Sequence, residues 1–399
     1  MVTYRGSNAG AKFLEKILEE EKRILELLKD VKEINMSKKE ENEFKRASSC
    51  YICGDGFSED NEKEHKVRDH CHFTGKYRGA AHNTCNLKLR TVKKIPIFFH
   101  NLAGYDSHII FQNLTAVEGV KTPKVIAKAM EKFVTFSIGK LQFKDSLQFL
   151  GSSLEKLVKN LADKTEVIQC PHCSYKKHKD DVKKHIKRVH KKEFNLDSNP
   201  KSEITLQHLF PNLHTYYLRK WGHLPESTFE LLTRKGVYPY SYMDCFSKFQ
   251  EKSLPPKEEF YNDLNKKHIS DDDYEHAKRI WKTFGLNNLG DLHNLYMETD
   301  VILLADVFEN FREFSLEEYK LDPAHFCTAP SLSWSAALLH TKQRLEIPTD
   351  PEMHMFFDKG VKGGISMVAN HYAKANHPDL PEYDSNVDTS DIGFFYCNV

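Results

Sequence analysis

Residues 69–86 read DHCHFTGKYRGAAHNTCN, and a Cys-x-x-Cys pair precedes them at Cys50 and Cys53. The stretch itself contains His82 and Cys85, which form a second pair with the spacing of metal ligands. Thiolates and a neutral imidazole suit a tetrahedral zinc ion. Because so short a polar segment cannot bury a core of its own, we expect zinc to hold it folded. The stretch therefore predicts a small domain built around a structural metal.

The composition of the whole chain limits the classes of protein to consider. The 399 residues are 40% hydrophobic and carry a net charge of +1, so any nucleic-acid contact must come from local patches. We find no apolar run of about 18 residues and no signal peptide, which argues against a membrane span and against secretion. Nine cysteines, four of them in two Cys-x-x-Cys pairs, favour zinc over disulfides. We expect an intracellular protein, with the nucleus as the preferred compartment.

The residues between and after the ligand pairs form a second pattern. Asp69-His70 is followed by GKYRG at 75–79, and Asn86 stands directly after the last cysteine. This pattern resembles the His-Me finger nucleases of the recombination endonuclease VII type, in which two zinc pairs flank a hairpin that carries Asp-His. His82 departs from the family, which has a cysteine at this position, but zinc accepts either ligand.

The resemblance implies a catalytic site beside the structural zinc. Asp69 and Asn86 would hold one Mg²⁺ ion, and hard oxygen ligands suit that metal. His70 would act as the general base that activates water, because a neutral imidazole can accept a proton near pH 7. The alternative is a zinc-held module that contacts DNA without catalysis, in which this histidine only supports the zinc ligands.

A different pattern begins at residues 95–106, IPIFFHNLAGYD, which predict a buried strand, a turn and a helix. The segment resembles the second exonuclease motif of family B DNA polymerases. That resemblance makes Asp106 a ligand of one of two catalytic Mg²⁺ ions and Asn101 a contact to the DNA 3′ end. Farther along, Tyr296-x3-Asp300 resembles the third exonuclease motif. Asp300 would then be a metal ligand, and Tyr296 would position the attacking water.

Between these two motifs, SSLEKL at 152–157 resembles an element that grips single-stranded DNA, through Ser153 and Leu154. The order of the three elements, with phrases such as FKDSLQFLGSSLEKLVKNL and TDVILLADVFENFREF, resembles the protein-primed family B polymerases of Polinton or Maverick elements and related viruses. The resemblance implies DNA (duplex and single-stranded 3′ ends) and a terminal priming protein as partners. Taken singly, each element has an ordinary alternative: Asp106 as a helix cap, Asp300 on a solvated helix face, and 152–157 as a plain helix start.

A second Cys/His unit predicts a second structural zinc. Its spacing resembles a Cys2His2 finger, although the central gap is one residue short. The segment is rich in lysine, which favours contact to DNA phosphates over base reading. An inserted structural knob with a solvated lysine face is the alternative. The proposed zinc ligands are Cys170, Cys173, His185 and His190, and the proposed DNA contacts are Lys183, Lys184, Lys187 and Arg188.

Shorter patterns predict the secondary structure around these units. Apolar spacing indicates an amphipathic helix over 11–34, and Ser37 with Glu40 indicates a capping box. Alternation over 133–146 predicts a hairpin that turns at Ile138-Gly139. Further helices are expected from SLEKL onwards, over 272–284 and 291–319, and over most of 312–375.

The fold class expected is α/β: an incomplete ribonuclease-H-like 3′-5′ exonuclease core that carries a zinc-held ββα-metal finger and an inserted Cys2His2 finger. The predicted parts are a helical segment (1–47), the endonuclease VII-like unit (48–92), the exonuclease-like domain (93–320, with the finger inserted at 168–192) and a linker (321–399). The first exonuclease motif and the polymerase palm motifs are not found, so we expect a truncated chain that cannot itself polymerise. A Mg²⁺-dependent His-Me finger endonuclease and a non-catalytic zinc-dependent remnant are the alternative functions.

Overall fold

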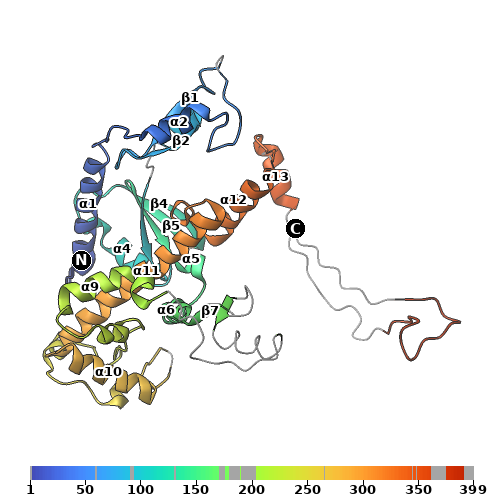
Figure 1. Ribbon diagram of the computed structural model, residues 1–399. Coiled ribbons are helices and arrows are strands. Elements are labelled where there is room, and N and C mark those ends of the chain that lie inside the picture. The colour runs from blue at the N-terminus through green and yellow to red at the C-terminus, as the bar shows by residue number, and fades with distance from the viewer. Residues whose placement is uncertain are drawn as a thin grey trace. The chain divides into compact units, whose positions relative to one another are not determined.

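The largest sheet among the described residues has four strands in the order β3-β6-β5-β4, and Figure 1 labels β4 and β5 of this sheet. β3 pairs in parallel with β6, while β6 with β5 and β5 with β4 pair antiparallel. The predicted hairpin is confirmed: β5 and β6 are joined by a turn in which Gly139 has a φ of +60°. The strands are β3 (Ile95–Phe99), β4 (Lys124–Ala129), β5 (Lys132–Ile138) and β6 (Leu141–Asp145).

The computed structural model describes residues 2–58, 61–89, 94–129, 132–169, 176–178, 189, 204–264, 266–343, 345–346, 348–360 and 374–390. It divides into two units, Met1–Ala337 and Leu338–Val399. The first unit is mixed α/β and contains every site discussed below. Among the described residues, no helix is both long enough and apolar enough to cross a membrane.

One hydrophobic core lies on the sheet. Alternating residues of β5 and β6 are buried in it, including Phe136 and Phe143, whose rings stack 4.5 Å apart. Helix α1 (Ala9–Leu27) adds Leu14, and α4 (Asp106–Gln112) adds Ile110. The predicted N-terminal amphipathic helix is therefore confirmed, although it ends at Leu27 instead of residue 34.

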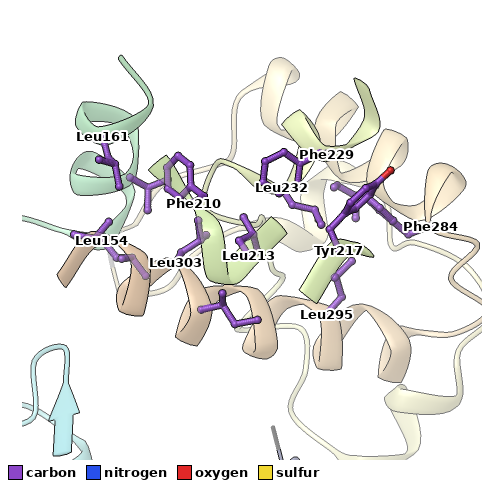
Figure 2. Packing of buried hydrophobic residues seen from close by; sticks show 14 of the residues in the cluster. Leu154, Leu161, Phe210, Leu213, Tyr217, Phe229, Leu232, Phe284, Leu295 and Leu303 are labelled. Carbon is purple, nitrogen blue, oxygen red and sulfur yellow. The ribbon is translucent and has the colours of Figure 1, made fainter. Parts of the chain in front are cut away.

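The second core is helical and centres on α11 (Leu289–Tyr319), which packs against α6 (Leu154–Ala162) and α9 (Pro211–Trp221). Figure 2 shows Leu295 and Leu303 on α11 facing Leu213 and the other apolar side chains of this cluster. Both α11 and the preceding α10 (Asp271–Thr283) match their predicted ranges closely, because capping residues define their starts: Asn288 and Ser270 each accept a backbone N–H.

The Cys/His segment forms a small ββα finger. β1 (Lys66–His70) pairs antiparallel with β2 (Tyr77–His82), and α3 (Asn83–Leu89) follows directly. α2 (Lys38–Arg46) packs beside it and begins with the predicted capping box, in which Ser37 and Glu40 exchange hydrogen bonds. The predicted ββα arrangement is confirmed at the level of secondary structure.

The remaining elements are short or peripheral. In the described part of 312–375, the end of α11 and the helices α12 (Ala329–Thr341) and α13 (Pro351–Gly360) make up most of the residues, as predicted, and non-helical stretches separate them. The other elements are η1 (Leu114–Ala116), α5 (Leu147–Leu150), η2 (Asp163–Glu166), β7 (Val167–Gln169), β8 (Lys176–His178), α8 (Leu206–Leu209), η5 (Glu226–Leu232), η6 (Phe246–Gln250), η7 (Lys257–Phe260) and η8 (Pro323–His325).

Candidate functional sites

The predicted ligands of the first zinc unit converge in the structure. One ligand atom from each of Cys50, Cys53, His82 and Cys85 lies within 4.8 Å of all the others. The Cys53 sulfur is 3.3 Å from Nδ1 of His82, and the Cys85 sulfur is 3.9 Å from the same nitrogen. Three sulfurs around one imidazole nitrogen are the donor set that zinc prefers. The cluster can therefore bind a metal such as zinc.

Hydrogen bonds outside the cluster prepare two of its members for a metal. Nε2 of His82 is 2.9 Å from the carbonyl oxygen of Gly56, so its N–H can donate there and leave Nδ1 free of a proton. Burial opposes ionisation of Cys50, but backbone N–H groups of Cys53, His82 and Ile52 outweigh it and lower the pKa of Cys50 to about 7. A thiolate and a correctly oriented imidazole are the forms that metal binding needs.

Asp69 and His70 lie at the end of β1, where the pairing with β2 is irregular. Asp69 pairs with Gly79 and His70 pairs with Tyr77, so one residue of β2 is left over between them. Such a bulge changes the direction of the side chains beside it. Asp69 is only 2% exposed, accepts a hydrogen bond from the Tyr51 hydroxyl and lies 3.9 Å from the Arg78 guanidinium.

Asn86 projects from α3 of the same finger and is 3% exposed. Its side-chain oxygen Oδ1 is buried and has no hydrogen-bond partner among the described residues. A buried amide oxygen without a partner costs free energy, so its presence calls for an explanation. A hard cation bound at this oxygen would provide one, and the residue therefore fits the predicted Mg²⁺ ligand.

The second candidate site lies where two parallel strands end together. β3 and β6 run in the same direction and pair Phe99 with Asp145, so the loop after β3 lies beside Asp145. The Asp145 carboxylate is fully buried and accepts the backbone N–H of Asn101 at 2.8 Å and of Leu147 at 3.0 Å. The carboxyl ends of parallel strands are a usual place for ligand sites in α/β proteins.

Asp106 begins α4, directly after this loop. Burial, and in addition the charge of Asp145, raise the pKa of Asp106 above its ordinary value. The alternative role of a helix cap is not observed, because Tyr105 occupies the capping position and no side-chain cap bond forms. Asp106 is therefore a half-buried carboxyl at the edge of the sheet, which is compatible with metal binding.

Asp300, on α11, has His100 as an electrostatic neighbour. Burial lowers the pKa of His100, which follows β3, while the charges of Asp145 and Asp300 oppose that shift. His100 is thus an electrostatic neighbour of both Asp145 and Asp300. Asp145 is also an electrostatic neighbour of Asp106. Burial raises the pKa of Asp300, and its Oδ1 has no hydrogen-bond partner in the described part of the chain. The alternative of a solvated helix face does not hold for this residue.

Tyr296 lies one helical turn before Asp300, and burial followed by the charge of Asp300 raises its pKa. Its hydroxyl bonds to that of Tyr240, and Lys235 Nζ lies 3.8 Å from Asp300 Oδ2. Tyr296, Tyr240 and Lys235 line a cleft of about 540 Å³, and Asp300 is not among the residues that line it. Its other lining residues include Tyr238, Phe260, Lys159, Arg234, Asp272 and Asp273.

The predicted DNA contacts are accounted for in other ways. Ser153 caps α6 by accepting the backbone N–H of Lys156, and Leu154 is 7% exposed within the helical core. Asn101 has a φ of +69°, and its side chain packs against Gly104. The structure gives Ser153 and Leu154 local structural roles, and a role of any of the three in DNA binding stays a prediction.

Most of the second Cys/His unit lies outside the described residues. Within the unit only Lys176–His178 and Val189 are described, and β8 (Lys176–His178) pairs antiparallel with β7, with Gln169 opposite Lys176. The roles of its proposed zinc ligands and DNA contacts stay predictions. The residues concerned are Cys170, Cys173, His185, His190, Lys183, Lys184, Lys187 and Arg188.

Sequence reasoning missed three residues of the second site: His100, Asp145 and Lys235. Asp145 could have been found, because it is the last residue of an alternating strand and polar residues gather where parallel strands end. That signal needs the knowledge that β6 pairs with β3, which alternation does not reveal. Lys235 carries no local signal at all, since only the packing of 234–237 against α11 brings it to Asp300.

Comparison with known proteins agrees with a DNA-processing role. A family model described as recombination endonuclease VII matches residues 27–108. The chain is also similar to a probable DNA polymerase of Ascobolus immersus, at 23% identity over 297 residues. The match covers 72% of this chain and 19% of that protein, so the chain spans about a fifth of its relative's length. No solved structure matches the chain.

Proposed function

We propose that this chain is the exonuclease-side part of a protein-primed family B DNA polymerase with a ribonuclease-H-like core. The observation that supports the proposal is a series of electrostatic neighbours where β3 and β6 end: Asp145 is a neighbour of Asp106, and His100 is a neighbour of both Asp145 and Asp300. The similarity of the chain to a probable DNA polymerase supports the proposal. The terminal priming protein remains a partner that only the sequence resemblance suggests.

The residues of this site fit a divalent cation. The buried Asp300 Oδ1 has no partner among the described residues and is an oxygen that an ion would satisfy. Burial and the charge of Asp145 raise the pKa of Asp106, and a bound cation would oppose both effects. Asp106 and Asp300 would hold Mg²⁺, which would supply charge stabilisation and an activated water. Asp145 holds the loop that carries Asn101. The aromatic and basic cleft next to Tyr296 would receive a single-stranded 3′ end.

Digestion of 5′-labelled single-stranded DNA with Mg²⁺ tests this proposal. We expect removal of one 3′ nucleotide at a time, and at least a ~100-fold loss of rate in Asp106→Asn and in Asp300→Asn, because a metal ligand contributes several kcal/mol to catalysis. Glu318→Gln is the matched control, since Glu318 is an exposed carboxylate at the far end of the same helix. Wild-type rates in both Asp variants would refute the proposal.

A second candidate function is favoured by the finger: Mg²⁺-dependent endonucleolytic cleavage at Asp69, His70 and Asn86. The buried Asn86 Oδ1 without a partner and the family match over 27–108 support it. In this site His70 would accept the proton of the attacking water. The exonuclease would remove nucleotides from a 3′ end, whereas the endonuclease would cleave within a strand. Assays on one preparation of the protein therefore distinguish the two candidate functions.

Nicking of supercoiled plasmid DNA tests the finger. We expect His70→Ala to lower nicking about 10²–10⁴-fold, the usual contribution of a general base, and to leave the zinc content unchanged. Cys85→Ala should lose one zinc, because Cys85 belongs to the metal cluster. His65→Ala, an exposed histidine in the same finger, is the control for nonspecific effects. DNA binding without any cleavage would leave only the non-catalytic module.

A further inference from the structure

The loop between β1 and β2 is a tight turn with a defined backbone. The N–H of Cys71 donates to the carbonyl of Lys76 at 2.8 Å, and the N–H groups of Thr74 and Gly75 donate to the carbonyl of Cys71 at 3.2 and 2.7 Å. Gly75 has a φ of +73°, a conformation that glycine adopts without strain. The loop therefore holds its tip residue, Phe73, in one place.

A separate part of the chain fixes the same loop from outside. The N–H of Lys32 donates to the carbonyl of His72 at 2.7 Å, and the N–H of Asn35 donates to the carbonyl of Gly75 at 2.8 Å. A side chain at position 75 would meet the Glu33 carbonyl oxygen at 2.4 Å. Residues 32–35 thus form a backbone clamp on the loop, and the loop is rigid on both of its sides.

This rigid loop presents an aromatic ring to solvent. Phe73 is 54% exposed and lies three residues after His70, the proposed general base. Single exposed apolar side chains are ordinary on protein surfaces. Here the backbone that carries the ring is held by five hydrogen bonds from two segments, and the loop directly follows Asp69 and His70 in the chain.

Two exposed cations follow Phe73 in the chain, with Glu40 as an electrostatic neighbour of Lys76 and Asp69 as the neighbour of Arg78. Lys76 is exposed on the same loop, and Arg78 on β2 has a side chain that is 45% exposed. Arg68, by contrast, is bound to Glu41 at 2.7 Å and stacks over Phe44. An aromatic face flanked by cations is the usual arrangement for stacking a base while holding its phosphates.

We propose that Phe73 stacks on an unpaired DNA base and so directs the finger to DNA with a local break in pairing. The proposal deepens the endonuclease function of the finger and rests on it. A ring carried by a fixed backbone loses little backbone conformational entropy when it binds, and this makes it an effective stacking surface. A fully paired duplex offers no free base face, so Phe73 should contribute little there.

Fluorescence anisotropy with labelled DNA, in buffer without Mg²⁺, tests this role in the full-length protein. We expect Phe73→Ala to weaken binding to a duplex with a two-nucleotide unpaired bulge about 10-fold, the size of one base–aromatic stacking contact. Binding to the matched paired duplex should change less than about 2-fold, and Phe73→Trp should restore the preference. Leu87→Ala is the control, since Leu87 is a 50% exposed apolar residue on α3 of the same finger.

The proposal would be overturned if Phe73→Ala weakened binding to the bulged and the paired duplex equally. It would also be overturned if this variant kept its zinc and bound the bulged duplex as tightly as the parent protein. A 2-aminopurine base in the bulge gives an independent signal, because stacking on Phe73 should quench its fluorescence and Phe73→Ala should abolish the quenching. The failure of the nuclease function looks different: plasmid nicking would be absent while the difference in binding remained.

Discussion

At the scale of single residues, two of the seven buried side-chain polar atoms without a partner in the described chain belong to the candidate sites. Asn86 Oδ1 in the finger and Asp300 Oδ1 on α11 both lack a hydrogen-bond partner among the described residues. Such groups destabilise a fold by about 1–3 kcal/mol each. Both atoms belong to residues that the sequence patterns assign to Mg²⁺. These residues therefore lower the stability of the free protein, and a bound cation would provide the partner that their oxygen atoms lack.

The cost at Asp300 predicts a dependence of stability on pH. Burial raises its pKa in the folded chain, with Lys235 and Tyr296 opposing the shift, so the folded state favours the protonated carboxyl. The stability that this proton provides is present below the unfolded value of about 3.9 and is lost as the pH rises through the folded pKa. Asp300→Asn should therefore raise the free energy of unfolding by ~1 kcal/mol at pH 7.

Thermal unfolding of both proteins without added Mg²⁺ measures this difference across the pH range. The advantage of Asp300→Asn should shrink as the pH falls towards 4, because the parent carboxyl is then protonated as well. An advantage that stays constant with pH, or a less stable variant at pH 7, would show that burial of the charge is not the cause.

At the scale of elements, the arrangement of strands and clamps decides where the chemistry lies. The parallel pair β3/β6 brings Asp145 to the loop that carries Asn101. The clamp at residues 32–35 fixes the finger loop, while α1 of the same N-terminal segment packs on the sheet. The N-terminal segment thus contacts both the sheet and the finger.

Gly75→Ala should release this clamp. The added methyl group would meet the Glu33 carbonyl at 2.4 Å, and the residue would also have to keep a φ of +73°. We expect a loss of ~1–3 kcal/mol and faster hydrogen exchange at residues 32–35. Gly119→Ala is the control, because Gly119 has a φ of +77° but nothing within 4 Å of its added methyl. Equal exchange rates at 32–35 in both variants would contradict the clamp.

At the scale of the whole molecule, stability resides in the first unit. Both hydrophobic cores lie before residue 338, and the described residues beyond it contain no buried side chain. Most of the described residues between α12 and α13 are exposed, Lys342 among them, and Lys342 has a φ of +55°. Exposed segments of this kind are the usual sites of proteolysis.

Brief trypsin treatment should therefore cut at Lys342 and leave the rest of the chain folded. We expect the fragment that ends there to keep its zinc and to unfold within about 2 °C of the intact protein. Lys159 in α6 and Lys220 in α9 are the internal controls, since they lie in helices that pack on α11 and should resist cleavage. A large fall in the unfolding temperature after cleavage would place essential contacts beyond residue 337.

Some features of this protein were determined by its sequence alone. The ligand pairs at 50–53 and 82–85, the capping boxes and the hairpin depend on residues close together in the chain, so spacing and local hydrogen bonding predicted them. Tertiary structure alone decided that His100 and Lys235 lie near Asp300, that Asp145 binds the loop after β3, and that residues 32–35 clamp the finger loop. The contacts of the second site join segments between 44 and 200 residues apart in the chain. The clamp pairs backbone groups, which every residue carries. Pairing of backbone groups leaves no mark on side-chain identity, and only the folded chain shows it.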